Sequence, residues 1–477
     1  MKKTIITALL AIIALAHAGA AKNYPENSDY LWVTVPDHDN WTYKVGEEAI
    51  IDVQFYKYGI PRDATIEYSI GGDCLPDDTH GKATMKRGKA TINMGTSRKP
   101  GFRDLRLTAN VDGKKYTHHV KVGFSPDKIR PYTAEPADFT EFWQSNLSRA
   151  AAFPLKYTRE PAPEYTTDRV EAWLIKLQTD REGHSLYAYL LVPRGAKPGS
   201  CPVVLTPPGA GVKRIKRVAE GMYYPENGVI RLVTEIHGLD PRLPETTFDD
   251  IRAAFDGRVK GYLYQGLDNR DNYYMRHVYT GLVRCIDLLT SLPEWDGRNV
   301  ITQGGSQGGA LAIIAAALDP RVTLCVANHP ALSDMAAAAA GLTGGYPHFT
   351  EKDGMLTPEK LETMAYYDVA NFARHVKATT FMTWGYNDNT CPPTTSYAVW
   401  NTLACPKECL VTPINEHWTS AATDRAQLDW ILSKLKNDSN PQEAVAMSLG
   451  AWPKRRKTDA EHGTRPTSEQ QKWAVPR

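Results

Sequence analysis

A glycine-rich turn between an apolar strand and an alanine-rich helix places the strongest constraint on the fold of this chain. Residues 299–303 read as a short buried strand and residues 307–318 as a helix, with Gly304-Gly305-Ser306 between them. Glycines are needed where a strand turns directly into a helix, because the backbone is crowded there. The turn would lift the serine hydroxyl above the edge of a sheet, in front of the N–H groups of the helix N-terminus. The pattern predicts a nucleophile elbow with Ser306 at its tip.

Other short apolar segments surround this turn and alternate with helical ones. The strand candidates are residues 202–206, 229–236, 322–327, 378–384 and 408–412, and the helix candidates include 138–152, 278–289 and 421–435. Apolar strands that alternate with helices are typical of a parallel sheet covered on both faces. We therefore expect an α/β-hydrolase catalytic domain with a mostly parallel sheet over residues 131–437. Residues 330–361 break the alternation and are interpreted as an insertion near the site.

The N-terminal part has a different pattern. Residues 22–125 show strand-like alternation and no helical period, and Asp112-Gly113 separates two alternating runs. Asp-Gly in that position is a strong hairpin signal, so a small all-β, Ig-like sandwich is predicted ahead of a proline-containing linker. His118 and His119 are neighbours on a predicted strand and should point to opposite faces, which favours ordinary strand residues over a metal site.

The two ends of the chain carry their own signals. Lys2-Lys3, an apolar run over residues 4–16 and Ala16-His17-Ala18 predict a signal peptide over residues 1–21. The run is shorter than the roughly 20 residues that span a bilayer, so we expect no membrane anchor and an exported protein, periplasmic or extracellular. Residues 438–477 form a polar tail, and its Lys454-Arg455-Arg456-Lys457 run is interpreted as a solvated charge cluster.

Charge and cysteine content exclude several classes of function. The chain has 56 Lys and Arg against 54 Asp and Glu, and a net charge of +2 offers no electrostatic reason to bind nucleic acid or a membrane surface. Seven cysteines in 477 residues are too few for a disulfide-built scaffold. Cys405 and Cys409 lack a second pair for zinc, although oxidation with Cys391 stays open. No metal or cofactor is predicted.

A serine hydroxyl needs a base near neutral pH, and that base needs an orienting carboxylate. In this fold the chain order is serine, acid and histidine, each on a loop that follows a strand. Asp388 follows the strand at 378–384, and His417 follows the strand at 408–412. Glu416 is a weaker candidate for the acid. Other downstream histidines fit this order less well, among them His329, His348 and His462.

The oxyanion hole should combine the N–H after the nucleophile with one from a loop after an early strand. The first is the N–H of Gln307. The second is expected in Pro207-Pro208-Gly209-Ala210-Gly211, where glycines allow close approach of the backbone to a substrate. We assign the N–H of Ala210, with Gly211 as the alternative. These residues predict acyl transfer through an acyl-enzyme on Ser306.

Several of these segments resemble the acetyl xylan esterase/cephalosporin-C deacetylase family over residues 131–435. They are the elbow at 304–309, the Pro-Glu-Trp-Asp at 293–296, the acid loop at 385–393, the His417 loop, and Pro-Ala-Asp-Phe-Thr-Glu-Phe-Trp at 136–143. The resemblance implies removal of acetyl groups from plant polysaccharide or oligosaccharide, with no metal or organic cofactor.

Two departures indicate a divergent branch of that family. His237-Gly238-Leu239-Asp240 stands where the family has Arg-Gly-Gln, and Pro208-Gly209-Ala210 stands where it has His-Gly-Tyr. The missing tyrosine leaves the preference for small acyl groups open, and both changes leave the oligomeric state open. His237 is interpreted as a structural contact rather than a substrate contact.

Three alternatives remain at this point. A serine peptidase of the prolyl-oligopeptidase type uses the same fold and triad, although the β-rich segment here is too short for a propeller. A hydrolase for another ester, such as a methyl glucuronate ester, is the second. The third is a carbohydrate-binding protein without catalytic activity, in which the sandwich binds the ligand. The residues of the sandwich do not decide its role.

Overall fold

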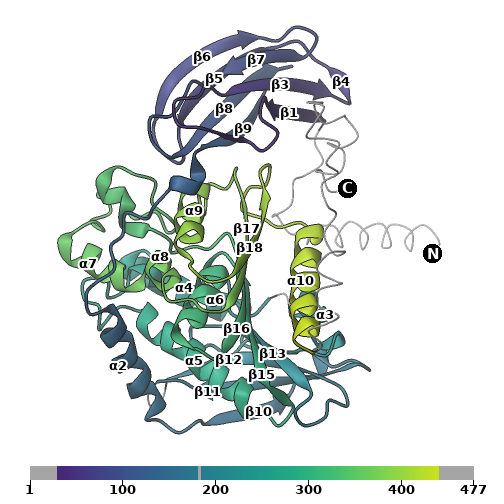
Figure 1. Cartoon of the computed structure of the whole chain (residues 1–477), viewed down its shortest axis with the longest axis vertical. Helices are drawn as coiled ribbons and strands as arrows, with labels where there is room; N and C mark the ends of the chain where they lie inside the picture. Colours follow the sequence, from purple (N-terminus) through teal and green to yellow (C-terminus); the bar gives the residue numbers. More distant parts are fainter. Residues whose placement is uncertain (1–28, 181–183, 217, 440–477) are drawn as a thin grey trace, which may run out of the picture.

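The computed structural model describes residues 29–180, 184–216 and 218–439. Figure 1 shows two small sheets, formed by the N-terminal part, stacked on one end of a larger α/β body. The predicted signal peptide and nearly all of the predicted polar tail lie outside the described residues.

The N-terminal strands form a four-stranded and a five-stranded sheet. The first joins β1, β3, β4 and β7, and the second has the order β2-β9-β8-β5-β6. A shared apolar core that includes Phe55, Ile66 and Val120 lies between them. The strands are β1 Tyr30–Pro36, β2 Thr42–Tyr43, β3 Ile50–Lys57, β4 Ile60–Pro61, β5 Thr65–Gly72, β6 Asp77–Thr84, β7 Lys89–Asn93, β8 Gly101–Val111 and β9 Lys114–Phe124.

The hairpin predicted at Asp112-Gly113 is present between β8 and β9. Val111 pairs with Lys114 across the turn, so the loop has two residues. Asp112 has φ 50° and Gly113 has φ 74°. Two consecutive positive φ values match the tight turn that suits the right-handed twist of antiparallel strands. The hairpin sets the register of β9, which carries residues that reach the larger α/β body.

The α/β body contains a nine-stranded sheet with the order β10-β11-β12-β14-β13-β15-β16-β17-β18. The strands from β13 onward pair in parallel, and β10 to β12 form an antiparallel edge. Sequence analysis does not identify this edge; β10 is exposed throughout and carries no apolar pattern. The strands are β10 Tyr157–Pro161, β11 Val170–Gln178, β12 Ser185–Pro193, β13 Cys201–Thr206, β14 Ile230–Thr234, β15 Trp295–Gly305, β16 Val322–Asn328, β17 Thr379–Gly385 and β18 Lys407–Thr412.

Helices cover both faces of this sheet, as the apolar strands predict. Val326 of β16 packs in one cluster with Leu428 and Ile431, while its neighbours Cys325 and Ala327 pack in the cluster on the opposite face. The helices are α2 Phe139–Ala151, α3 Tyr223–Glu226, α4 Glu245–Val259, α5 Met275–Ser291, α6 Gln307–Leu318, α7 Pro358–Tyr367, α8 Val369–Ala373, α9 Pro393–Thr402 and α10 Ala421–Ser439. The α/β-hydrolase fold class is confirmed.

The N-terminal sheets sit on α9 and on the loops that follow β17 and β18 (Figure 1). Asn401 of α9 donates its amide N–H groups to the carbonyls of Pro126 and Ile129. Phe102 of β8 packs edge-on against Tyr386, with ring centroids 4.8 Å apart. The N-terminal part therefore covers the segment of the catalytic body in which Asp388 lies.

The described residues include all seven cysteines, and each is a free thiol, so the Cys391 disulfide alternative is not realised. Among the described helices, none is long and apolar enough to cross a membrane.

Candidate active site

Ser306 occupies the sharp turn between β15 and α6. Its backbone has φ 59° and ψ −125°, a conformation that a non-glycine residue adopts only when its surroundings enforce it. A Cβ on Gly304 would lie 2.5 Å from the backbone of Gly308, and a Cβ on Gly309 would lie 2.5 Å from the carbonyl oxygen of Asn328. Only glycine fits at these positions, which explains the glycines around the serine.

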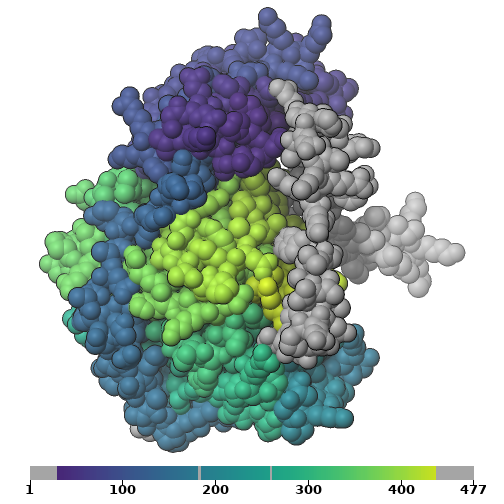
Figure 2. Space-filling model, viewed as in Figure 1, coloured from purple at the N-terminus to yellow at the C-terminus, as the bar shows by residue number. Residues whose placement is uncertain are grey.

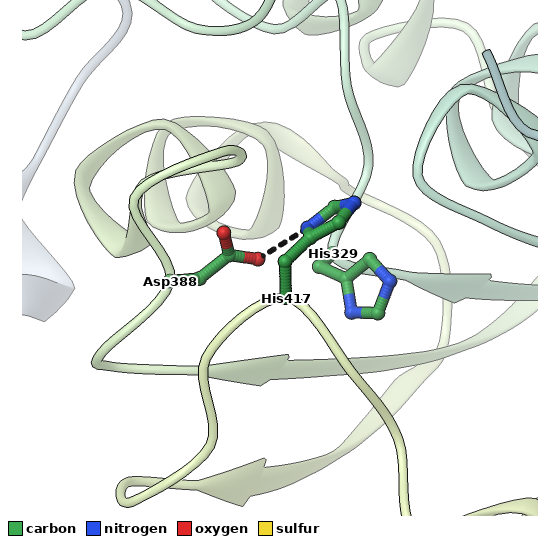
Figure 3. A group of neighbouring side chains, drawn as sticks. All are labelled: His329, Asp388 and His417. Carbon is green, nitrogen blue, oxygen red and sulfur yellow. Dashed lines mark hydrogen bonds and ion pairs between the residues drawn. The ribbon is translucent and has the colours of Figure 1, made fainter. Parts of the chain in front are cut away.

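Ser306, His417 and Asp388 form one chain of hydrogen bonds. His417 Nε2 lies 3.0 Å from Ser306 Oγ, and His417 Nδ1 lies 2.8 Å from Asp388 Oδ2. Figure 3 shows the second of these contacts. Because an ionised carboxylate only accepts hydrogen bonds, Nδ1 carries the proton and Nε2 is free to accept the serine proton. The structure thus brings together the three residues that the chain order suggests.

Asp388 is held as a carboxylate although it is fully buried. Its Oδ1 accepts N–H groups from Thr390 at 2.7 Å and Cys391 at 2.8 Å, which leaves Oδ2 for His417. Burial acts to raise its pKa, but the hydrogen bond and charge of His417 and the backbone N–H keep the pKa of Asp388 below the usual value. The acid is therefore both ionised and fixed in orientation.

Glu416, the weaker candidate for the acid, points elsewhere. Its side chain is 64% exposed, and its carboxylate faces His119 of β9 at 3.7 Å. A solvent-exposed carboxylate orients an imidazole less firmly than a buried one does. Asp388 is the carboxylate that contacts the His417 ring.

The loop at 207–211 packs against the elbow, as expected for an oxyanion loop. A Cβ on Gly308 would lie 2.6 Å from the carbonyl oxygen of Pro207. Gly211 donates its N–H to the hydroxyl of Tyr262 at 3.1 Å, and that hydroxyl donates to Gln307 Oε1 at 2.5 Å. The N–H of Gly211 is thus engaged, which favours Ala210 of the two alternatives. Gln307 opens α6, where the first N–H groups have no acceptor within the helix.

Tyr262 is a site residue that sequence analysis does not identify. It lies in a short 3₁₀ turn, Tyr262–Tyr264, and no motif surrounds it. Its buried hydroxyl joins the oxyanion loop to the first residue of α6. His237 supports the same loop: its Nε2 lies 3.3 Å from the carbonyl oxygen of Gly211, and its Nδ1 lies 2.8 Å from the Tyr274 hydroxyl. Burial lowers the pKa of His237 to about 4, so it is a neutral contact at neutral pH.

His329 lies beside His417, with ring centroids 4.5 Å apart (Figure 3). Sequence order removes it as a base, and folding nevertheless brings it to the site. Burial, followed by repulsion from His417, lowers the pKa of His329 to about 4. The neutral ring therefore adds no positive charge next to the base.

Within the described part of the chain, His329, Asp388 and His417 also form a group close enough to share a metal ion, with ligand atoms within 4.8 Å of one another. A metal there would have to displace the Nδ1 proton through which His417 donates to Asp388. Among these three described side chains, the hydrogen bond from His417 Nδ1 to Asp388 Oδ2 orients the imidazole, so the group fits a catalytic triad better than a metal site.

Comparison of the chain with known proteins identifies its family. The family model for acetyl xylan esterase (AXE1) matches residues 126–434. The chain belongs to this family. Acetyl esterase Axe7A from Xylanibacter ruminicola is 54% identical over 436 residues, which cover 91% of this chain and 98% of that protein. The chain is therefore a carboxylic ester hydrolase, and the resemblance noted from the sequence is confirmed.

Solved structures of the acetyl xylan esterase family agree with this assignment. The acetyl xylan esterase from Paenibacillus sp. R4 is 26% identical, with a TM-score of 0.58, and the match covers 65% of this chain and 98% of that one. Acetyl xylan esterase 1 from Thermoanaerobacterium sp. JW/SL YS485 shares the fold with a TM-score of 0.57 at 22% identity, over 64% of this chain and 96% of its own. The family match and the 54% identity to Axe7A support ester hydrolysis over the peptidase and binding-protein alternatives.

Proposed function

We propose that this chain is an exported serine esterase that removes acetyl groups from xylan or xylan-derived oligosaccharides. The observation that carries the proposal is the hydrogen-bonded chain Ser306–His417–Asp388, found in a member of the acetyl xylan esterase family. Both solved relatives bear the name acetyl xylan esterase, and Axe7A bears the name acetyl esterase.

The first half-reaction transfers the acetyl group to the enzyme. His417 Nε2 takes the proton of Ser306 as Oγ attacks the ester carbonyl carbon. Asp388 stabilises the imidazolium that forms. The N–H groups of Ala210 and Gln307 donate to the oxyanion, and the sugar oxygen leaves with the proton from His417.

The second half-reaction releases acetate. His417 takes a proton from a water molecule, whose oxygen attacks the acetyl-enzyme carbonyl. The same two N–H groups donate to the oxyanion, and the proton returns to Ser306 Oγ as acetate leaves. Every group that moves a proton is supplied by this chain.

The test compares the purified enzyme with Ser306→Ala on acetylated xylan, with released acetate as the readout. We expect acetate from the wild type and almost none from the variant, and faster turnover of p-nitrophenyl acetate than of longer acyl esters. Parallel assays use a peptide anilide and a methyl glucuronate ester. If either is turned over faster than the acetyl substrates, the proposed substrate class is wrong.

The export proposal rests on the basic residues, apolar run and small residues at the N-terminus, which lie outside the described residues. N-terminal sequencing of protein recovered from the periplasm or medium should give a start between Gly19 and Lys22. Recovery of the chain in the cytosol with Met1 retained would contradict export.

A further inference from the structure

A buried ion pair joins the N-terminal sheets to the catalytic acid loop. Lys121 of β9 is 0% exposed, and its Nζ donates to Asp73 Oδ1 at 2.7 Å. The same Nζ donates to the backbone carbonyl of Asp388 at 2.8 Å, and the Lys121 N–H donates to Asn387 Oδ1 at 2.9 Å. Lys121 thus makes one hydrogen bond to Asp388, whose side chain is the proposed catalytic carboxylate, and one to the preceding residue, Asn387.

Asp73 holds the other end of the same loop. Its Oδ2 accepts the N–H of Thr394 at 3.1 Å and the Thr394 hydroxyl at 2.7 Å. Thr394 lies in the first turn of α9, where a carboxylate also interacts favourably with the helix dipole. The segment from Asn387 to Thr394 is therefore bound at both ends by one Lys–Asp pair from the N-terminal sheets.

The charges of this pair are mutually dependent. Burial disfavours the ammonium form, yet the neighbouring Asp73 carboxylate holds the pKa of Lys121 above its ordinary value. Both members of the pair belong to the N-terminal part, so docking does not create the pair but buries it, and Asp388 and Thr394 of the α/β body then satisfy its remaining hydrogen-bonding atoms. In Figure 2 the purple N-terminal part rests directly on the yellow-green segment that contains this loop.

A second contact reaches the histidine loop from the same strand. His119 lies two residues before Lys121 and shares its strand face. Its Nδ1 lies 3.1 Å from Asp104 Oδ1, and its Nε2 faces Glu416, which directly precedes His417. Although burial opposes protonation, hydrogen bonds to Asp104 and Glu416 raise the pKa of His119 to about 9. The sequence favours ordinary strand residues at positions 118 and 119. His119 in addition contacts Glu416, which lies in the loop of His417.

From these contacts we infer that the N-terminal sandwich is a positioning element of the active site: Lys121 and Asp73 hold the acid loop so that the Asp388 carboxylate meets His417. This inference rests on the proposed catalytic function of Asp388. It makes Lys121 and Asp73 positioning residues, because they act through the Asp388 backbone and touch no substrate. The sandwich thereby contributes to catalysis by positioning Asp388, whether or not it binds a carbohydrate.

The main test is the double variant Lys121→Met/Asp73→Asn, which removes both buried charges together and so leaves neither unpaired. Lys115→Met on the same strand is the control, because Lys115 is exposed. We expect the double variant to lower kcat for p-nitrophenyl acetate about 10- to 100-fold, with KM nearly unchanged, since small displacements of a catalytic group reduce rates by such factors. Thr394→Val is a milder variant, useful if the double variant does not fold, and should lower kcat in the same direction.

A merely structural role is distinguished by repeating the double variant in an Asp388→Asn background. If Lys121 and Asp73 act through the Asp388 carboxylate, the double variant should lower kcat there by less than about twofold, because the positioned group is already lost. An equal fold-loss in both backgrounds would overturn the inference, as would an unchanged kcat in the folded double variant. If Asp388→Asn by itself has wild-type activity, the proposed role of Asp388 as the catalytic acid fails instead.

Discussion

The substitution Asp388→Asn gives a sharp prediction because the structure specifies how the amide will be oriented. Asp388 Oδ1 accepts two backbone N–H groups, from Thr390 and Cys391. In the variant the amide oxygen must take this place, since the opposite orientation would set the NH₂ group against two donors. Two lost hydrogen bonds of about 1 kcal/mol each favour the first orientation by about 2 kcal/mol or more.

The amide NH₂ group then faces His417 Nδ1 at the position of Oδ2. It donates to Nδ1, so the proton of the neutral imidazole moves to Nε2, and Nε2 loses the lone pair that accepts the Ser306 proton. The wrong tautomer should lower kcat about 10⁴-fold, which corresponds to about 5.5 kcal/mol of activation free energy. The cause is chemical, because the loop keeps both backbone hydrogen bonds.

The assay is steady-state hydrolysis of p-nitrophenyl acetate, paired with thermal unfolding to show that the variant is folded. Asp429→Asn, on the exposed surface of α10, is the matched control and should keep wild-type kcat. A folded Asp388→Asn enzyme with more than about a tenth of the wild-type kcat would refute the tautomer argument.

Three further predictions concern the oxyanion loop, a buried acid and the thiols. Gly308→Ala places a Cβ 2.6 Å from the Pro207 carbonyl oxygen, so the loop must shift and kcat for p-nitrophenyl acetate should fall about 100-fold with little change in KM. Burial raises the pKa of Glu235 from 4.5 to about 7. At a pH between these two values, Glu235 is protonated in the folded state and ionised in the unfolded chain. The free energy of unfolding, relative to Glu235→Gln, should therefore decrease by up to about 3 kcal/mol as pH rises from 4.5 to 7 in denaturant titrations; no relative change would contradict this. Thiol titration in denaturant should count all seven cysteines as free, and a reducing agent should leave the unfolding temperature unchanged.

Local pattern was enough to predict the parallel core of the sheet and the elbow. The helix over residues 307–318 and the strands that flank it occur where periodicity places them. The elbow can be predicted because contacts within a short segment, such as that between Gly304 and Gly308, leave room only for glycine. The loops of Asp388 and His417 were found because chain order in this fold restricts the choice.

The residues that support the site left no such local signal. Tyr262, His329 and Lys121 come from separate elements, and none belongs to a motif. Lys121 and Asp388 are 267 residues apart in the sequence. A lysine on a strand with alternating polar and apolar residues is usually solvent-exposed. The burial of Lys121 follows from the packing of the N-terminal sheets against the loop of Asp388, which sequence periodicity does not describe.

The fold class, the turn that carries Ser306 and the chain order that selects Asp388 and His417 can all be predicted from the amino-acid sequence. The folded chain adds that Ser306 Oγ, His417 and Asp388 meet at hydrogen-bonding distance, and that a lysine from the N-terminal sheets binds the acid loop. This difference follows from the range over which the interactions act. Strand, helix and turn preferences act between near neighbours, whereas a buried charge is stable only beside a partner that folding brings from elsewhere in the chain.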